Sequence, residues 1–164
     1  MTNTTKTEFT LSGSAFFGLM QSVLSRGASF RFQAKGQSMS PFIRHGDIIT
    51  VAKVESNAVR VGDVVVLLNP ANNAAIVHRI VNIQENSILL KGDNCISADG
   101  IFSYDTILGI VTKVERGNKE VKFCLGPANK LIAITSANGS LNTVLPLLRK
   151  LKKLFFLQKH NAEA

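Results

Sequence analysis

The sequence predicts a mainly β fold of antiparallel sheets, with one helix before the sheets and helices after them. Between residues 48 and 125, short apolar runs rich in Val and Ile alternate with turn signals such as Asn-Pro and Gly-Asn. Helical spacing of apolar residues occurs only outside that region, at 12–26 and after 127. Short strands at close spacing, joined by tight turns, favour antiparallel sheets that coil on themselves.

The first expected element is a helix from Ser12 to Arg26, which follows a polar segment, residues 1–10, expected to be disordered. A hydroxyl residue can cap the start of this helix, and Gly27 is a typical residue just past a helix end. Its apolar side chains recur at threes and fours, which predicts one face packed in the core. They are Phe16, Leu19, Met20, Val23 and Leu24.

Seven strands are expected after this helix. The first, Phe30 to Ala34, alternates apolar and polar residues, as a half-buried strand does. The others are more continuously apolar and are separated by Gly, Asn, Asp and Pro. They are expected at residues 48–54, 63–68, 75–84, 87–91, 107–115 and 120–125.

The character of the chain changes after residue 125. Pro127 can open a short helix that runs to about Asn138, and a second, basic amphipathic helix is expected from Leu141 to Leu157. The expected organisation is therefore a disordered segment 1–10, a β domain with its leading helix at 11–125, and a helical extension at 126–164. The segment 141–158 either lies on an anionic membrane surface or packs its apolar side on the domain.

Composition narrows the function classes. The chain has 164 residues and a net charge of +8, but five of its basic residues lie between 149 and 159 without an acid among them. The remainder is mildly basic, so no nucleic-acid partner is expected. Cys95 and Cys124 match no metal-binding spacing; they could pair with each other, but reduced thiols are expected. No apolar run is long enough to span a membrane, and residues 1–8 do not resemble a secretory signal. A cytoplasmic or peripherally membrane-associated protein is therefore expected.

The most informative stretch runs from Gly36 to Asp47. Gly36 allows a sharp bend, and Pro41 restricts both its own backbone and that of Ser40. Ser38 lies between these two residues, on a stiff corner that can aim a hydroxyl. Gly, Ser and Pro are also ordinary turn residues, so a purely structural turn is the alternative.

A histidine and two acids complete a possible catalytic set. His78 interrupts the apolar run of the strand at 75–84, and Asp93 and Asp99 lie in a polar turn that follows it. Neutral imidazole can activate a serine hydroxyl near pH 7, and a carboxylate on the other ring nitrogen fixes the tautomer. A satisfied core histidine and a plain Gly-Asp-Asn turn are the structural alternatives.

Together these segments resemble the signal peptidase I clan of serine proteases. The resemblance covers about residues 30 to 115, and its pieces occur in the clan's order. Within the clan the chain is most similar to the archaeal and endoplasmic-reticulum branch, because His78 stands where the bacterial branch has lysine. The shared pieces are Gly-x-Ser-Met-x-Pro at 36–41, Gly46-Asp47, Gly62-Asp63-Val64-Val65, His78-Arg79-Ile80-Val81, Lys91-Gly92-Asp93-Asn94, Asp99 and Leu108-Gly109-Ile110-Val111.

The resemblance implies coiled antiparallel sheets of the signal-peptidase and repressor-protease type. It also implies roles: Ser38 as nucleophile, with its backbone N–H as one oxyanion donor, His78 as general base, and Asp99 or Asp93 as the orienting acid. Met39 and Pro41 belong to the same motif and are expected to contact the substrate. An extended peptide or preprotein is the expected partner, and neither a cofactor nor a metal is needed.

Two features depart from the clan's pattern. Gly36 stands where bacterial members often have a serine that supplies a second oxyanion donor, and no spanning anchor helix is visible. The first expectation is a serine endopeptidase that removes a leader or signal segment. The alternatives are an inactive peptide-binding module on the same scaffold and a self-cleaving regulator. Related self-cleaving repressors use a lysine base and usually carry an N-terminal DNA-binding domain, and neither is seen here.

Overall fold

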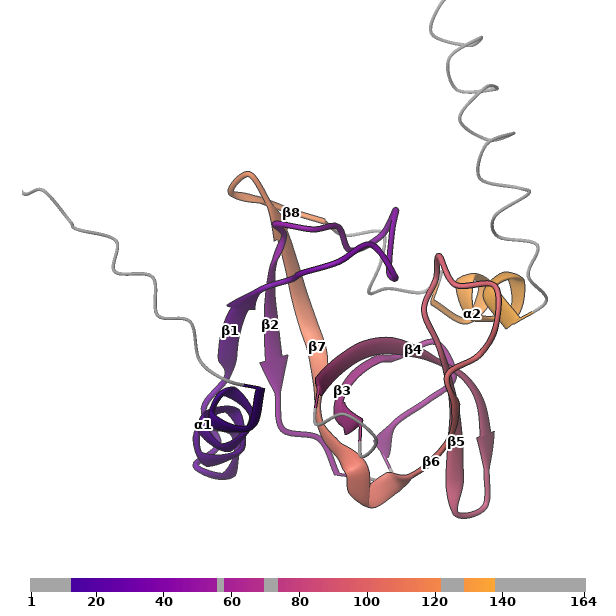
Figure 1. The fold of residues 1–164 in the computed structure, drawn as a ribbon, viewed down its shortest axis with the longest axis horizontal. Coiled ribbons are helices and arrows are strands. Elements are labelled where there is room, and N and C mark those ends of the chain that lie inside the picture. The colour runs from indigo at the N-terminus through magenta and orange to yellow at the C-terminus, as the bar shows by residue number, and fades with distance from the viewer. Residues whose placement is uncertain (1–12, 56–57, 70–73, 122–128, 138–164) are drawn as a thin grey trace, which may run out of the picture.

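A computed structural model describes residues 13–55, 58–69, 74–121 and 129–137 of the chain. The described part is mainly β, with eight strands and two α-helices, which confirms the predicted fold class (Figure 1). The elements are α1 (Gly13–Ser25), β1 (Phe30–Gln33), β2 (Ile48–Ala52), β3 (Val64–Asn69), β4 (Ala74–Gln84), β5 (Ser87–Lys91), β6 (Gly100–Ser103), β7 (Ile107–Arg116), β8 (Lys119–Glu120) and α2 (Asn129–Ala137).

All strand pairs are antiparallel and form one sheet with the order β1-β2-β7-β3-β4-β5-β6, to which β8 adds on β7. Strands that are consecutive in the chain pair with each other except around β7, which inserts between β2 and β3. Figure 1 shows β3 to β6 curling round on themselves beyond β7, while β1 and β2 extend to the other side. The sheet therefore coils, as its short strands predict.

The two faces of β3 pack in two different cores. Val64 and Val66 belong to a first core, whereas Val65 and Leu67 belong to a second. Side chains alternate across a strand, so a strand whose residues are apolar at every position is one that is buried on both faces. This explains the unbroken run of Val and Leu in β3. The strand β4, which carries the candidate histidine, likewise contributes Val77 to the first core and Ile76 and Ile80 to the second.

The leading helix closes the first core. Phe16 of α1 makes edge-to-face contacts with Phe30 and Phe32 of β1, with ring centroids 5.5 and 5.2 Å apart. Met20 and Leu24 are buried in the same core. At the end of the helix, the Gly27 and Ala28 N–H groups donate to the Leu24 and Val23 carbonyls, at 3.0 and 3.3 Å, as in a Schellman motif.

The element boundaries differ from the predicted ones at a few places. The strand β6 was not predicted, because its four residues alternate between exposed and half-buried positions and contain a glycine. The last strand, β8, is only two residues long, and residues 122–125 of the predicted strand lie outside the described part. The predicted helices at 12–26 and 127–138 correspond to α1 and α2. The predicted segment 1–10 and the helix at 141–157 also lie outside the described residues.

The helix α2 packs on the β domain. Ile132 is buried in the first core, and α2 contacts β4 (Figure 1). Two of its apolar side chains face outward instead: Leu131 is 67% exposed and Ile134 is 48% exposed. Among the described helices, none is both long and apolar enough to cross a membrane.

Candidate active site

The nucleophile corner is a loop that is closed at its neck. The Ala34 N–H donates to the Asp47 carbonyl at 2.7 Å, and the Gly46 N–H donates to the Ala34 carbonyl at 2.9 Å. Inside this neck, Gly36 has a φ of +88°, a backbone conformation that L side chains rarely adopt, so a glycine is needed there. The half-buried Ser38 follows, two residues after the bend and three before Pro41. The predicted stiff corner is thus present.

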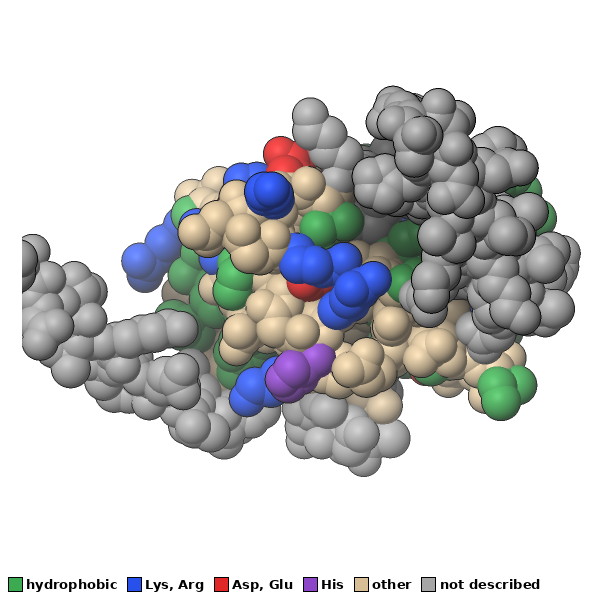
Figure 2. Space-filling model, turned by 90° about the horizontal axis from the view of Figure 1, so that it is seen from above, with side chains coloured by type: hydrophobic (Ala, Val, Ile, Leu, Met, Phe, Trp, Pro, Cys, Tyr) green, Lys and Arg blue, Asp and Glu red, His purple; other side chains and the backbone are tan. Residues whose placement is uncertain are grey.

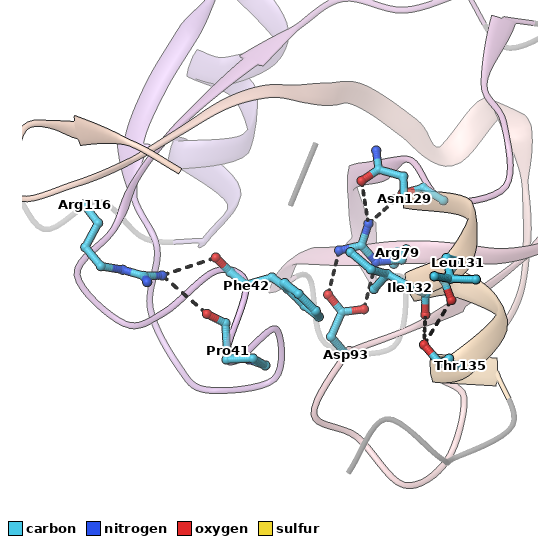
Figure 3. Close-up of polar contacts among 10 residues, drawn as sticks. Pro41, Phe42, Arg79, Asp93, Arg116, Asn129, Leu131, Ile132 and Thr135 are labelled. Carbon is cyan, nitrogen blue, oxygen red and sulfur yellow. Dashed lines mark hydrogen bonds and ion pairs between the residues drawn. The ribbon is translucent and has the colours of Figure 1, made fainter. Parts of the chain in front are cut away.

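An arginine from the end of β7 holds the other side of this loop (Figure 3). The Arg116 side chain donates to the Asp47 carboxylate from Nε at 2.9 Å and from Nη2 at 2.7 Å, and Nη2 also donates to the Phe42 carbonyl at 3.2 Å. Burial acts to raise the pKa of Asp47, but the hydrogen bonds from Arg116 and from the Arg44 N–H outweigh it. The pKa of Asp47 therefore lies below its usual value.

The candidate base is bound to one of the two candidate acids. His78 Nδ1 lies 2.5 Å from Asp99 Oδ2, and the two side chains are 10% and 23% exposed. Asp99 is held in place by its backbone N–H, which donates to the Leu90 carbonyl of β5 at 2.9 Å. Because Nδ1 is bound to the carboxylate, Nε2 is the ring nitrogen of His78 that can interact with other groups.

The tight turn after β5 brings the nucleophile loop and this histidine to one place. A Cβ atom on Gly92 would lie 2.8 Å from the Ser38 carbonyl oxygen, 2.9 Å from His78 Nε2 and 2.7 Å from Cys95 Sγ. The Ser38 carbonyl oxygen and His78 Nε2 therefore lie within 2.9 Å of the same point, on the same side of Gly92. The Asn94 N–H also donates to the Ser38 carbonyl at 2.7 Å, which docks the turn on the loop.

A buried ion pair between Arg79 and Asp93 fixes the position of this turn. Arg79 Nε and Nη2 donate to the two carboxylate oxygens of Asp93 at 2.8 and 2.7 Å, and neither side chain is exposed. Arg79 Nη1 donates to the Gly62 carbonyl at 2.7 Å and, more weakly, to Asn129 Oδ1 at 3.5 Å. Figure 3 shows the guanidinium between Asp93 and Asn129, with the Phe42 ring nearby; its Cζ is 5.7 Å from that ring centroid.

The sequence left open whether Asp93 or Asp99 orients His78, and the structure distinguishes the two acids. Asp99 binds the His78 ring, whereas Asp93 does not, because both of its oxygens are taken by Arg79. Of the two expected substrate contacts, Met39 is only 4% exposed and packs in the first core. Pro41 is half-buried, and its carbonyl accepts a hydrogen bond from Arg44 Nε at 3.2 Å.

Several residues that meet at the site had no predicted role in it. They are Gly92 and Cys95, which meet His78 and Ser38, and Arg116, which holds the loop. Arg79 did carry a signal, because a charged residue in an otherwise apolar strand needs a buried partner. Arg116 carried none, since its partner Asp47 is 69 residues away in the chain.

One edge beside the histidine is left open by the described strands. The strand β4 is eleven residues long, and β5 pairs only with its part from Arg79 onward. Residues 74–78 pair with β3 on one side, and no described strand pairs with them on the other. An edge of this kind presents backbone donors and acceptors that an added strand can use.

The charges around the site are unevenly distributed. Lys91 is buried and its Nζ donates to the Ser136 carbonyl in the last turn of α2, at 2.5 Å. Burial raises the pKa of the Cys95 thiol, and the nearby Asp99 carboxylate raises it further. Within the described residues, no group of three or more His, Cys, Asp and Glu side chains is placed to hold a metal ion.

The surface of the molecule carries clustered basic side chains. On the face seen in Figure 2, Lys and Arg side chains gather around an acidic side chain.

Comparison with protein families finds a match. The model of the Peptidase S24-like family matches residues 3–114, which is more than half of the chain and includes Ser38, His78 and Asp99. A search among curated proteins finds no match. The family comprises serine peptidases and self-cleaving regulators, and some of its members are inactive. The chain belongs to the Peptidase S24-like family.

Proposed function

We propose that this protein is a serine endopeptidase of the signal-peptidase type, which removes a leader or signal segment from an extended peptide or preprotein. The observation that carries the proposal is the hydrogen bond between His78 Nδ1 and Asp99, together with the position of His78 Nε2 near the backbone carbonyl of Ser38. A histidine that is oriented by a carboxylate and faces a serine is the arrangement that acyl transfer requires. The histidine also favours the archaeal and endoplasmic-reticulum branch of the clan.

The proposed reaction is an acyl transfer in two steps. Ser38 Oγ attacks the scissile carbonyl carbon while His78 Nε2 accepts the hydroxyl proton and then gives it to the leaving amine. Water next attacks the ester on Ser38, with His78 again taking and returning a proton. Asp99 accepts the hydrogen bond from Nδ1–H, so that Nε2 carries the lone pair. The Ser38 N–H is the first donor to the oxyanion.

The open edge of β4 is where the substrate adds in this proposal. A peptide that pairs with residues 74–78 as an extra strand would end beside His78, because that residue is the last one before β5 begins to pair. Backbone pairing gives affinity that does not depend on sequence, and side-chain pockets then select the substrate. An extended leader segment is the kind of ligand that such an edge binds.

The test is covalent labelling and cleavage by matched variants. Wild-type protein is treated with a fluorophosphonate and is incubated with a library of extended peptides, whose products are identified by mass spectrometry. Labelling is expected to be lost in Ser38→Ala, and cleavage is expected to fall at least about a thousandfold in Ser38→Ala and His78→Ala. Ser40→Ala and His45→Ala are the controls, because Ser40 is a second hydroxyl two residues from Ser38 and His45 is an exposed histidine.

Two other outcomes identify the alternatives. If Ser38→Ala cleaves as fast as wild type, Ser38 is not the nucleophile. If wild-type protein neither labels nor cleaves, a peptide-binding module is the better description. A self-cleaving regulator, which the family also includes, would lose intact mass on long incubation at a rate independent of protein concentration. Ser38→Ala would abolish that loss as well, so concentration dependence separates self-cleavage from cleavage of a partner.

We also propose that the basic segment 141–158 attaches the enzyme to anionic membrane surfaces. Its sequence carries Arg149, Lys150, Lys152 and Lys153 beside a set of Leu and Phe residues. Such a segment is attracted to acidic lipids by about 1 kcal/mol per basic residue near the surface. Co-sedimentation with phosphatidylserine vesicles, compared with phosphatidylcholine vesicles and with the four residues changed to Gln, tests this. Equal sedimentation of both proteins would contradict it.

A further inference from the structure

The buried Lys91 joins the strand end before the active-site turn to the end of α2. Its residue is only 3% exposed, and its Nζ donates to the Ser136 carbonyl in the last turn of α2 at 2.5 Å. Among the described residues, no carboxylate pairs with this lysine. The C-terminal end of a helix carries partial negative charge on its free carbonyl groups, which stabilises a buried ammonium. The end of α2 therefore compensates the Lys91 charge.

The acceptor for this lysine is the helix backbone and not a side chain. The Ser136 hydroxyl is also buried, but its Oγ makes no hydrogen bond to any described residue. The contact therefore depends on where α2 lies, and it would survive the loss of the hydroxyl.

The start of α2 is docked beside the same two strands. Arg79 of β4 lies directly opposite Lys91 of β5, so both side chains leave the sheet on the same face. Arg79 Nη1 donates weakly to Oδ1 of Asn129, the first residue of α2, at 3.5 Å. A Cβ atom on Gly62 would lie 2.7 Å from the Asn129 carbonyl carbon, so the helix start packs directly against the chain there. The helix is thus held at both ends, and Figure 3 shows it beside Arg79.

The active-site turn begins immediately after Lys91. The next residue is Gly92, whose lack of a side chain allows the close approach of the Ser38 carbonyl oxygen and His78 Nε2. Burial raises the pKa of the Cys95 thiol in this turn and the Lys91 charge opposes the rise, so the ammonium acts on the turn. A displacement of Lys91 would therefore move the turn relative to the histidine.

We propose that Lys91 is a positioning residue, through which α2 holds the Gly92 turn in place beside His78. The C-terminal helix is then an integral part of the active site instead of an appendage to the β domain. The match to the Peptidase S24-like family ends at residue 114, so α2 lies outside the matched region. The effect on catalysis rests on the proposed peptidase function, whereas the placement of the turn by α2 does not.

Hydrogen exchange, followed by mass spectrometry on the full chain without substrate, tests the placement of the turn. Three amides of the turn donate hydrogen bonds in the folded protein and report its order. They are Asn94, Cys95 and Asp99. Lys91→Met has a similar shape but no donor. It is expected to speed exchange in peptides from the turn and from α2 by about 10- to 100-fold, the effect of losing a hydrogen bond to a charged group.

Two matched controls are expected to exchange as wild type does. Lys130→Met removes an exposed lysine of α2, and Ser136→Ala keeps the carbonyl that Lys91 binds. Exchange in the turn that is unchanged in Lys91→Met overturns the proposal, because the turn is then independent of α2. An equal rise in β1 and β2 also overturns it, because Lys91 then supports the whole fold and not the turn.

Catalysis is the second arm, with a peptide that wild-type protein cleaves. In Lys91→Met, kcat is expected to fall about a hundredfold, as it does when reacting groups are misplaced by about 1 Å. KM should stay close to that of wild type, because the open edge of β4 is not altered. Lys91→Arg keeps a charged donor and should restore most of kcat.

The two arms separate the two proposals. If the turn loosens in Lys91→Met but kcat does not fall, Lys91 has no positioning role in catalysis, and the proposal is wrong. If wild-type protein cleaves no peptide, the peptidase function fails, and hydrogen exchange still decides whether α2 places the turn.

Discussion

At the scale of single residues, the site depends on the lack of a side chain at Gly92. Gly92 has no Cβ, and the space that a Cβ would take is surrounded by the Ser38 carbonyl, the His78 ring and the Cys95 sulfur. Real Cβ atoms do not approach other atoms this closely. The absence of a side chain at Gly92 is therefore what allows the histidine and the nucleophile loop to meet.

Gly92→Ala is expected to lower the free energy of unfolding by about 1–3 kcal/mol and to lower peptidase activity, because the new methyl group overpacks the site. Urea unfolding and peptide cleavage measure the two effects. Gly18→Ala is the control: Gly18 lies inside α1 with nothing within 4 Å of a Cβ, so it should gain up to about 1 kcal/mol. Equal stability of Gly92→Ala and wild type would contradict this account of the contact.

The Cys95 thiol is expected to react slowly with maleimide at neutral pH. Its pKa is raised above the usual 9.0 by burial and by Asp99, so little thiolate is present, and the rate should continue to rise above pH 9. Asp99→Asn removes a negative charge and should speed labelling at pH 7.5. The measurement uses the Cys124→Ser background and mass spectrometry. Labelling as fast as that of a free cysteine peptide would show that the pKa is not raised.

At the scale of elements, the loop at 36–47 is held from both sides. Arg116 of β7 binds the Asp47 carboxylate and the Phe42 carbonyl on one side, and the Asn94 N–H binds the Ser38 carbonyl on the other. Each contact joins the loop to an element far away in the chain. The orientation of Ser38 is thus set by tertiary contacts as much as by the glycine and proline beside it.

The Asp47–Arg116 pair should make stability depend on acid pH. The pKa of Asp47 is lower in the folded protein than the usual 3.8, so its contribution is complete above that value and is lost as the pH falls through the folded pKa. Melting temperatures between pH 7 and pH 2.5 measure this. Asp47→Asn should be less stable than wild type at pH 7 and should approach wild type at the acid end. A constant difference between the two proteins across this range would contradict the assignment.

At the scale of the whole molecule, Arg79 joins parts that are distant in sequence. Its guanidinium binds Asp93 in the turn after β5, the Gly62 carbonyl before β3 and Asn129 at the start of α2. An arginine that is fully buried in this way is stable only if its charge is balanced. The pair therefore couples the packing of α2 to the position of the active-site turn.

Asp93→Ala is expected to lower the free energy of unfolding by about 3–5 kcal/mol, because it leaves the Arg79 charge buried without its partner. The double variant Arg79→Met with Asp93→Leu removes both charges and should recover much of that loss. Chemical denaturation measures all three proteins. A double variant that is as unstable as Asp93→Ala would show that shape, rather than charge balance, is what the pair supplies.

The sequence was a good guide to what is local. The helix α1, six of the strands and the bend before Ser38 follow from apolar periodicity and from glycine and proline, which act within a few residues. It could not decide between Asp93 and Asp99, since both lie in one polar turn and only the packing of Arg79 separates them. Cys95 was missed for the same reason, because its proximity to His78 depends on the path of the turn.

The position of β7 has a consequence for how this protein folds as it leaves the ribosome. Strand β2 ends at Ala52, but its neighbour β7 begins only at Ile107. The nascent chain therefore emerges with β2 unpaired on that side, and the serine corner waits for Arg116 to be synthesised. The packing of the serine corner is thereby completed only after translation has passed Arg116.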